Sequence, residues 1–237
     1  MPRTRFVLIG SSHPGNVGAA ARAIKVMGFS DLVLVAPRFA DVLTRDETVA
    51  MASGATDVLD HARVVATLTE ALDGVSYACA TAMTPRDFGP PTFAPRALFE
   101  TLASSPHDVA FVFGSERHGL SNDDVYRCHA TLSIPTDPDY GSLNLAQAVQ
   151  LIAYDWRQAL GGFAVEARTP SATLADGVAV QGLLDHWQRA LVGIGFLNPA
   201  APKKLMPRLH GLVNRTQLTQ EELHILRGIA KAIEEKR

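Results

Sequence analysis

Five short apolar runs divide the first 160 residues of this 237-residue chain, and segments with helical spacing alternate with them. The runs are Arg5–Gly10, Asp31–Ala36, Val75–Ala82, Asp108–Phe113 and Ala130–Ile134. The helical segments are Asn16–Met27, Thr44–Ala52, Val64–Leu72, Pro95–Leu102, Ser121–Tyr126 and Ser142–Leu160. Strands that are apolar throughout and alternate with helices predict a mostly parallel sheet with helices on both faces. We therefore expect an α/β domain over residues 1–160.

The rest of the chain has a different pattern. Residues 161–172 contain Gly, Pro and Ser without periodicity, and we interpret them as a linker. Residues 173–235 predict two or three helices and no strand, so they cannot extend the sheet. We expect residues 173–237 to form a separate helical extension.

Composition narrows the class of protein. Apolar residues make up 47% of the chain, enough for a sizeable core. No apolar run approaches the roughly 20 residues of a membrane-spanning helix. The two cysteines, Cys79 and Cys128, are far apart and lack a CxxC spacing. We expect a cytoplasmic protein, free of disulfides and membrane anchors.

Basic charge gathers at the two ends of the chain. The formal net charge is −2, but residues 1–38 and 198–237 each carry +4. Folding or dimerisation that brought these ends to one face would create a surface for a polyanion. The alternative is ordinary surface charge. No P-loop, GxGxxG, GxSxG or HExxH motif occurs, which disfavours nucleotide-phosphate, dinucleotide, hydrolase and metal sites; we expect no metal.

Three segments combine polar side chains with turns at strand ends. In residues 11–29, a turn opens a helix that carries Arg22 and Lys25 on one face, and the start of this helix suits a phosphate. The alternative is a core helix with two solvated cations. In residues 111–120, Gly114 and Glu116 follow a buried strand, where ligands of α/β sheets bind; a plain connection is the alternative. In residues 132–149, Ser142 is expected to cap a long helix that carries Asn144 and Gln147.

These segments, "NVGAAARAIKVMGF", "FVFGSERHGLSNDDVYRCHATLSIPT" and "SLNLAQAV", together with the final "ELHILRGIAKAIEE", resemble the SPOUT superfamily of RNA methyltransferases. The similarity is to its TrmH-like branch and, within it, to the TrmJ type, and it covers essentially the whole chain. The resemblance implies a SPOUT α/β knot, a deep trefoil knot formed around residues 110–160. It implies a homodimer with sites built from both chains.

The resemblance also implies S-adenosylmethionine as cofactor, held largely by backbone groups. The cofactor contacts that it implies are Ala80, Thr81, Ala82, Gly114, Ile134, Gly141, Ser142 and Leu143. Arg22 would bind the adjacent phosphate and stabilise negative charge on a ribose 2′-oxygen, since an arginine is a poor base. Asn16 would orient Arg22 or the ribose, Glu116 would hold the site together, and Ser142 and Asn144 would shape the catalytic centre.

The implied activity is 2′-O-methylation of the pyrimidine at position 32 in the tRNA anticodon loop. RNA contacts are expected at Lys25, Arg86, Lys203, Lys204, Arg208, Arg215 and Arg227. Ser115 and Gly141 stand where TrmJ-type sequences often have Arg and Ser, and TAMTPR replaces a common SARSR loop. These departures affect the RNA contacts and the choice of nucleotide. An rRNA 2′-O-methyltransferase and a catalytically silent RNA-binding SPOUT protein are the alternatives.

Overall fold

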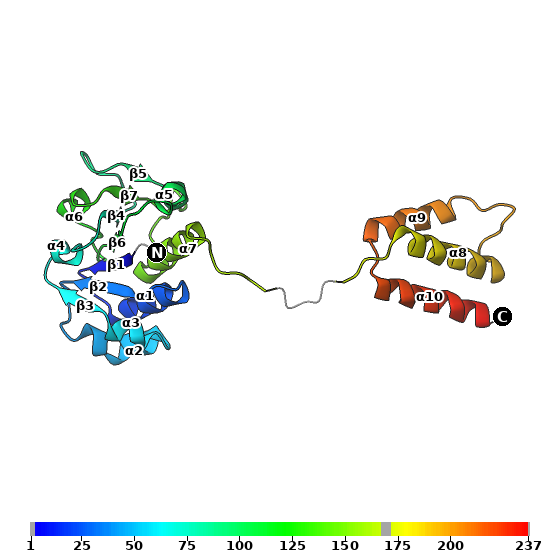
Figure 1. Ribbon diagram of the computed structural model, residues 1–237, viewed down its shortest axis with the longest axis horizontal. Coiled ribbons are helices and arrows are strands. Elements are labelled where there is room, and N and C mark those ends of the chain that lie inside the picture. Colours follow the sequence, from blue (N-terminus) through cyan, green and yellow to red (C-terminus); the bar gives the residue numbers. More distant parts are fainter. Residues whose placement is uncertain (1–2, 167–171, 237) are drawn as a thin grey trace. The chain divides into compact units, whose positions relative to one another are not determined.

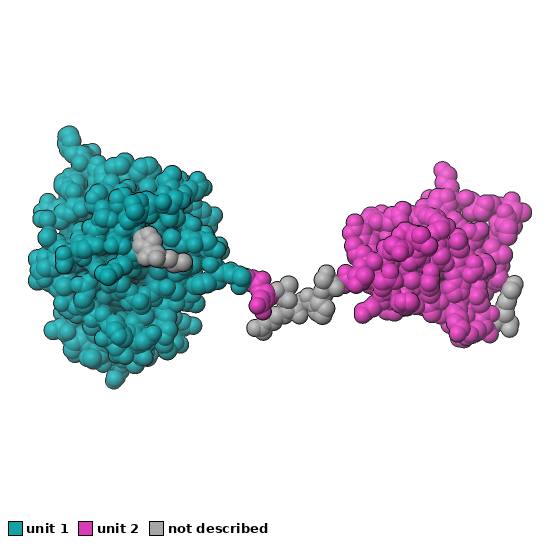
Figure 2. All heavy atoms as spheres, in the orientation of Figure 1, with its two compact units in different colours: residues 1–164 teal, residues 165–237 magenta. Residues whose placement is uncertain are grey.

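The computed structural model describes residues 3–166 and 172–236, and the chain divides into two units, residues 1–164 and 165–237 (Figures 1 and 2). Each unit has its own buried core and is described by itself below. Residues 167–171, which belong to the predicted linker 161–172, lie outside the described residues.

A seven-stranded sheet forms the centre of the first unit, in the order β3-β2-β1-β6-β4-β7-β5. Neighbouring strands of this sheet pair in parallel, which confirms the predicted, mostly parallel α/β fold. In register, Phe6 of β1 lies between Leu32 of β2 and Phe111 of β6. The strands are β1 Thr4–Ile9, β2 Asp31–Val35, β3 Arg63–Val65, β4 Tyr77–Thr81, β5 Thr92–Phe93, β6 Val109–Phe113 and β7 Ala130–Leu132.

Two of these strands were not expected. Strand β3 lies where the spacing predicted the helix Val64–Leu72, so that prediction is wrong at its start. Its β-branched Val64 and Val65 extend along β2, and the helix that follows is only Leu68–Ala71, capped by Thr67. Strand β5 lies in the proline-rich segment and pairs with β7 at the sheet edge, where prolines interrupt no interior ladder.

Helices cover both faces of the sheet. Residues of α1, α2, α3, α5 and α7 join one hydrophobic cluster, and residues of α4 and α6 join the other. Successive residues of β1 alternate between them: Phe6 and Leu8 face the first cluster and Val7 the second. The helices are α1 Pro14–Val26, α2 Asp46–Ala52, α3 Thr56–Asp60, α4 Leu68–Ala71, α5 Pro95–Leu102, α6 Asn122–Tyr126 and α7 Leu145–Ala159, with a 3₁₀ turn at Val42–Thr44.

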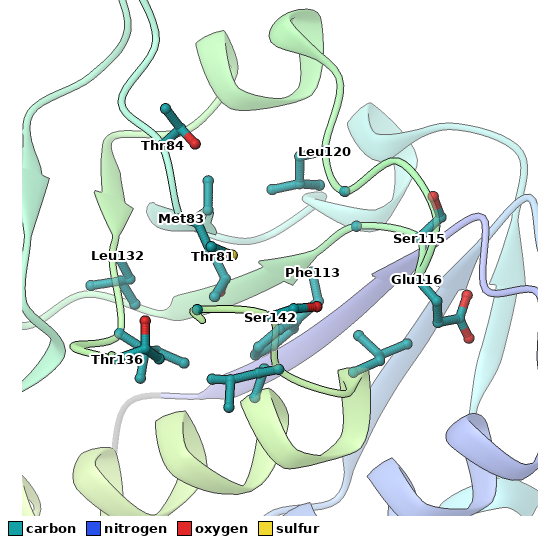
Figure 3. A pocket seen from close by; sticks show the side chains of 18 of the residues that line it. Thr81, Met83, Thr84, Phe113, Ser115, Glu116, Leu120, Leu132, Thr136 and Ser142 are labelled. Carbon is teal, nitrogen blue, oxygen red and sulfur yellow. The ribbon is translucent and has the colours of Figure 1, made fainter. Parts of the chain in front are cut away.

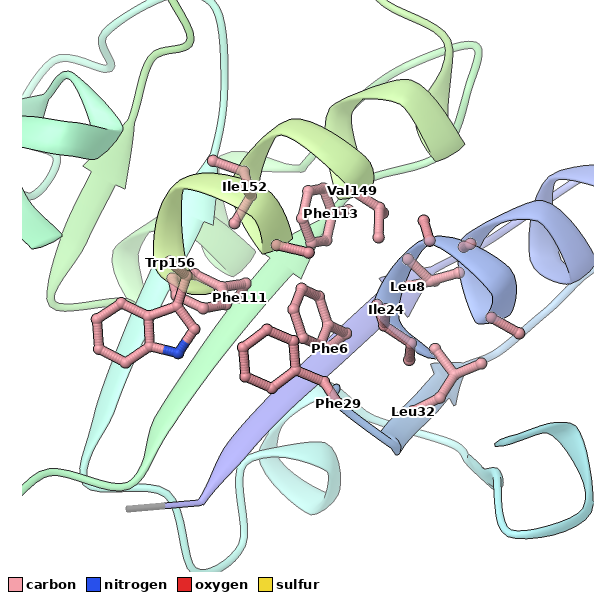
Figure 4. Close-up of a cluster of buried hydrophobic side chains, with 14 of the residues drawn as sticks. Phe6, Leu8, Ile24, Phe29, Leu32, Phe111, Phe113, Val149, Ile152 and Trp156 are labelled. Atoms are coloured by element: carbon pink, nitrogen blue, oxygen red, sulfur yellow. The ribbon is translucent and has the colours of Figure 1, made fainter. Parts of the chain in front are cut away.

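Aromatic side chains fill the larger cluster (Figure 4). The Phe111 ring lies 5.6 Å from the rings of both Phe6 and Trp156, measured between centroids. The indole Nε1 of Trp156 donates a hydrogen bond to Thr4 Oγ1, so its polar atom is satisfied within the core. Burial of each such side chain stabilises the fold by about 1.5–3 kcal/mol. The contact of Trp156 with Phe111 also holds α7 against β6.

The described residues of the second unit form three helices, α8 Gly177–Gly193, α9 Leu205–Thr216 and α10 Gln220–Glu235, where the sequence predicts two or three. Leu183 and Leu184 of α8 pack with Leu223 and Ala230 of α10, all nearly inaccessible to solvent. Asp176 caps α8, and a capping box of Thr219 and Glu222 begins α10. Within residues 3–166 and 172–236, no helix combines the length and apolar content that crossing a membrane requires.

Candidate active site

A pocket of about 270 Å³ opens at the carboxyl edge of the sheet, where the loops after β4, β6 and β7 meet (Figure 3). Ligands of parallel sheets bind at this edge because the loops there follow several strand ends at once. The pocket is lined by Thr81, Ala82, Met83, Thr84, Arg86, Phe113, Gly114, Ser115, Glu116, Gly119, Leu120, Leu132, Ile134, Thr136, Gly141, Ser142, Leu143, Leu145 and Ala148.

The structure places all but one of the expected cofactor contacts in this lining. Those that line it are Thr81, Ala82, Gly114, Ile134, Gly141, Ser142 and Leu143. Ala80 does not, because successive residues of a strand point to opposite faces. Its side chain is fully buried in the smaller hydrophobic cluster.

Several lining residues escaped the sequence reasoning, notably Met83, Thr84, Phe113, Leu120 and Thr136. Three of them, Met83, Thr84 and Thr136, lie in loops directly after strands, a signal that could have identified them. Phe113 and Leu120 resemble any core residue in the sequence, and only the fold shows that they also form a pocket wall.

Glu116 joins the pocket to α1 through a network of hydrogen bonds. Its Oε2 accepts from the backbone N–H and the hydroxyl of Ser12, at 2.9 and 2.8 Å. Its Oε1 accepts from Asn16 Nδ2 at 2.8 Å and from the backbone N–H of His13 at 3.3 Å. Asn16 Oδ1 in turn accepts from Asn144 Nδ2 at 2.9 Å. One chain of contacts thus links the three motifs that sequence analysis singled out.

The same hydrogen bonds keep Glu116 ionised. Partial burial raises the pKa of its carboxyl, but the bonds from Asn16 and from Ser12 outweigh burial and lower the pKa to about 2. The carboxylate also lies at the start of α1, where free N–H groups favour a negative charge. The phosphate expected at this helix start is therefore replaced by the protein's own carboxylate.

Asn144 rather than Ser142 caps the long helix, so the cap predicted at Ser142 is wrong by two residues. Asn144 Oδ1 accepts from the N–H groups of Ala146 and Gln147, and Gln147 Oε1 accepts from the N–H of Asn144. This capping box leaves the Asn144 Nδ2 group free to reach Asn16. Ser142 instead lines the pocket, in the loop before α7.

One buried polar atom of the pocket lining has no hydrogen-bond partner among the described residues. Thr81 Oγ1 is buried without a hydrogen bond among the described residues. A buried hydroxyl of this kind costs free energy unless a ligand or water satisfies it. Backbone groups around Gly114 and the apolar Ile134 and Leu143 complete a lining that fits the amino-acid and adenine parts of S-adenosylmethionine.

The cations of the first unit are spread over different places. Arg22 is exposed, six residues beyond Asn16 and about 9 Å further along the axis of α1. It does not line the pocket and has no bonded partner among the described residues. Lys25 pairs with Asp57 at 2.7 Å and also bonds the Gly54 carbonyl, which ties α1 to the segment around α3. Arg86 lines the pocket.

Of the expected RNA contacts in the second unit, Lys203, Lys204 and Arg208 line one cavity at the start of α9. Arg215 is exposed in the last turn of α9. Arg227 instead donates to the Ala179 carbonyl, so it joins α10 to α8. No group of three His, Cys, Asp or Glu side chains that could hold a metal ion occurs in the described part of the chain.

Comparison with known proteins gives two matches to family models. Residues 3–154 match the SpoU rRNA Methylase family, and residues 178–237 match the C-terminal domain of the tRNA methyltransferase TrmJ. The first match contains the whole sheet and most of α7, and the second contains nearly all of the three C-terminal helices.

Individual relatives align over nearly the full length. The chain is 42% identical to the tRNA (cytidine/uridine/adenosine-2′-O-)-methyltransferase TrmJ of Pseudomonas aeruginosa, over 97% of this chain and 93% of that one. It is 39% identical to the tRNA (cytidine/uridine-2′-O-)-methyltransferase TrmJ of Klebsiella pneumoniae, over 98% and 96%. The crystal structure of TrmJ from Z. mobilis superposes with a TM-score of 0.82 at 30% identity, covering 99% of both chains.

Proposed function

Because the chain belongs to the SpoU rRNA methylase family and ends in a TrmJ C-terminal domain, we propose that it transfers a methyl group from S-adenosylmethionine to a ribose 2′-hydroxyl of tRNA in the cytoplasm. The observation that carries the proposal is the hydrogen-bonded chain Glu116–Asn16–Asn144 beside the pocket. It connects a candidate cofactor pocket to polar groups that can meet a ribose. A catalytically silent RNA binder would have no need to keep this network intact.

S-adenosylmethionine supplies an activated methyl group when bound. Thr81, Gly141 and Ser142 would hold it with polar and backbone groups, and Ile134 and Leu143 would pack against it. The Thr81 hydroxyl would gain the partner that it lacks. Apolar walls of this kind also exclude water, which would compete with the ribose for the methyl group.

The residues around the acceptor have separate tasks. Glu116 and Asn144 position Asn16, which lies in the first turn of α1. Fixing the acceptor oxygen in line with the methyl donor contributes up to about 7–11 kcal/mol to the barrier reduction. The hydrogen bonds of Glu116 hold Ser12, His13 and Asn16, so Glu116 is a positioning residue. Arg22 binds the phosphate next to the acceptor and stabilises negative charge on the 2′-oxygen.

The proposal includes a homodimer in which each site draws on both chains. What supports it is the position of Arg22, exposed and outside the pocket lining of its own chain. In the proposed dimer, the arginine needed at the acceptor oxygen would come from the partner chain. The fold resemblance implies the same arrangement.

The substrate is proposed from the relatives and from the second unit. The relatives are named for cytidine and uridine, and one also for adenosine, so the group they share as acceptor is the ribose. We assign position 32 of the anticodon loop as the target. Lys203, Lys204, Arg208 and Arg215 would bind tRNA phosphates, which makes binding sensitive to salt.

The test is methyl transfer from radiolabelled S-adenosylmethionine to a tRNA transcript, with the modified nucleotide identified by mass spectrometry. We expect 2′-O-methylation at position 32 and a loss of about 10²–10³-fold in kcat/KM in Arg22→Ala. Arg96→Ala, which removes an exposed arginine of α5 outside the pocket together with its ion pair to Asp155, controls for the loss of a surface arginine. Labelling of rRNA but not tRNA, or cofactor binding without methyl transfer, would contradict the proposal.

A further inference from the structure

A second cavity, of about 660 Å³, lies inside the second unit between the end of α8 and the start of α9. All of its lining comes from residues 196–208. Its size is that of a typical small-molecule site. It is separate from the methyl-transfer pocket, whose lining lies wholly in the first unit.

The turn after α8 explains how an aromatic ring comes to this cavity. Gly195 adopts a left-handed φ of +73°, and the N–H groups of Phe196 and Leu197 both donate to the Leu191 carbonyl. This ending buries Leu197 and leaves the neighbouring Phe196 68% exposed in the cavity lining. An exposed phenyl ring at a tightly held turn presents apolar surface to a ligand.

The lining of this cavity contains three cationic side chains and no carboxylate. Lys203, Lys204 and Arg208 line the cavity, and no Asp or Glu is among its lining residues. None of the three side chains forms an ion pair or a hydrogen bond with a described residue, in contrast to Arg227 of the same unit. Their charge therefore remains available for an anion.

We propose that this cavity binds one unstacked nucleotide of single-stranded RNA. The base stacks on Phe196, and the adjoining phosphates bind Lys203, Lys204 and Arg208. The inference rests on the proposed function in taking tRNA as the physiological source of that nucleotide. Asn198 contributes amide N–H donors to the base edge, since only its Oδ1 is engaged, by the Ala200 N–H.

The combination of ring and cations selects this ligand over a plain phosphate backbone. Contacts to a duplex backbone need positive charge alone and leave the bases covered. Splayed bases of loops and single strands stack on aromatic side chains, and this stacking tolerates any base. The loops and the 3′ end of a tRNA contain such bases.

Steady-state kinetics of the full-length protein with a tRNA transcript tests the site. We expect Phe196→Ala to raise the KM for tRNA roughly tenfold while kcat and the affinity for S-adenosylmethionine stay unchanged. Phe196→Tyr, which keeps a stacking surface, should restore the KM. Ile225→Ala removes another exposed apolar side chain, on α10 and outside the cavity lining, and should have no effect.

A direct probe uses Phe196→Trp in the full chain, with the wild type titrated in parallel to subtract the emission of Trp156 and Trp187. A single-stranded pyrimidine oligonucleotide should quench the new tryptophan, whereas the same sequence as a duplex, or inorganic phosphate, should not. Equal quenching by duplex RNA would overturn the inference. So would an unchanged KM in Phe196→Ala beside a raised KM in the double variant Lys203→Ala/Lys204→Ala, because the site would then read phosphates only.

These outcomes separate the two proposals. Wild type that methylates no tRNA would refute the proposed function, while quenching by single-stranded RNA would still support the nucleotide site. Wild type that methylates tRNA normally, together with Phe196→Ala at the wild-type KM, would refute the nucleotide site alone.

Discussion

At the scale of single residues, Glu116 carries a charge that the fold depends on. Its pKa of about 2 lies below the 4.5 of an ordinary glutamate, so the folded state is favoured wherever the carboxyl is ionised. This contribution is fully present above about pH 4.5 and is lost as the pH falls toward 2. Since the carboxyl is only partly buried, we expect it to be worth about 1 kcal/mol.

Glu116→Gln should therefore lower the free energy of unfolding by about this amount at neutral pH. The difference from wild type should shrink to near zero between pH 4.5 and 2. Urea unfolding at a series of pH values, followed by circular dichroism, measures it. Wild type and variant that keep a constant difference down to pH 2 would show that Glu116 is not the group that titrates.

The sequence indicated which polar residues belong to the site better than it indicated which hydrogen bonds they form. Glu116, Asn16 and Asn144 stand out in the sequence as polar groups at strand and helix ends. That Asn16 bonds both of the others could not be inferred, because these contacts span 100 and 128 residues. The closeness of Gly141 and Met83 could not be inferred either. Both residues depart from the pattern of related sequences, and a Cβ at Gly141 would lie 2.6 Å from Met83 Cε. The two departures therefore occupy one space.

At the scale of elements, the start of α7 has two tasks that mutation can separate. Asn144→Ala removes both the cap and the amide donor to Asn16, and should cost about 1 kcal/mol of stability together with activity. Asn144→Ser keeps a capping oxygen but has no amide. We expect it to retain the wild-type melting temperature within about 2 °C and to lose about tenfold or more in kcat.

Thermal melting and methyl-transfer rates on the same preparations distinguish these effects. A serine variant with full activity would mean that Asn144 acts only as a helix cap. A serine variant as unstable as the alanine variant would mean that the cap geometry at this position needs an amide.

Elements with an apolar run or a helical period in the sequence were predictable, including the short β7 and α6, but the two short strands β3 and β5 were not. The five apolar runs and the long helices have enough residues for a period to show. Strands β3 and β5 have three and two residues, and their extended form comes from pairing with β2 and β7. Such pairings depend on the tertiary fold. The trefoil knot stays a prediction from family resemblance.

At the scale of the whole molecule, the two units divide the proposed labour. Deleting residues 170–237 should abolish tRNA methylation, with at least about a hundredfold loss in kcat/KM, because the cations of the second unit are removed. Binding of S-adenosylmethionine should persist, since the pocket lies entirely within residues 81–148. Calorimetry with the cofactor and a tRNA methylation assay measure the two. Full tRNA activity in the truncated chain would refute the division.

The position of β1 in the sheet has a consequence for biosynthesis. Of the strands of this sheet, β1 is synthesised before the others; β2 soon follows and covers one of its edges, but its other neighbour, β6, begins only at Val109. At ordinary elongation rates the gap corresponds to about 5–20 seconds. Throughout that interval the nascent chain presents an unpaired apolar strand edge to its surroundings. Slow translation or a shortage of chaperones should therefore lower the yield of native protein well before it affects any assay of the finished molecule.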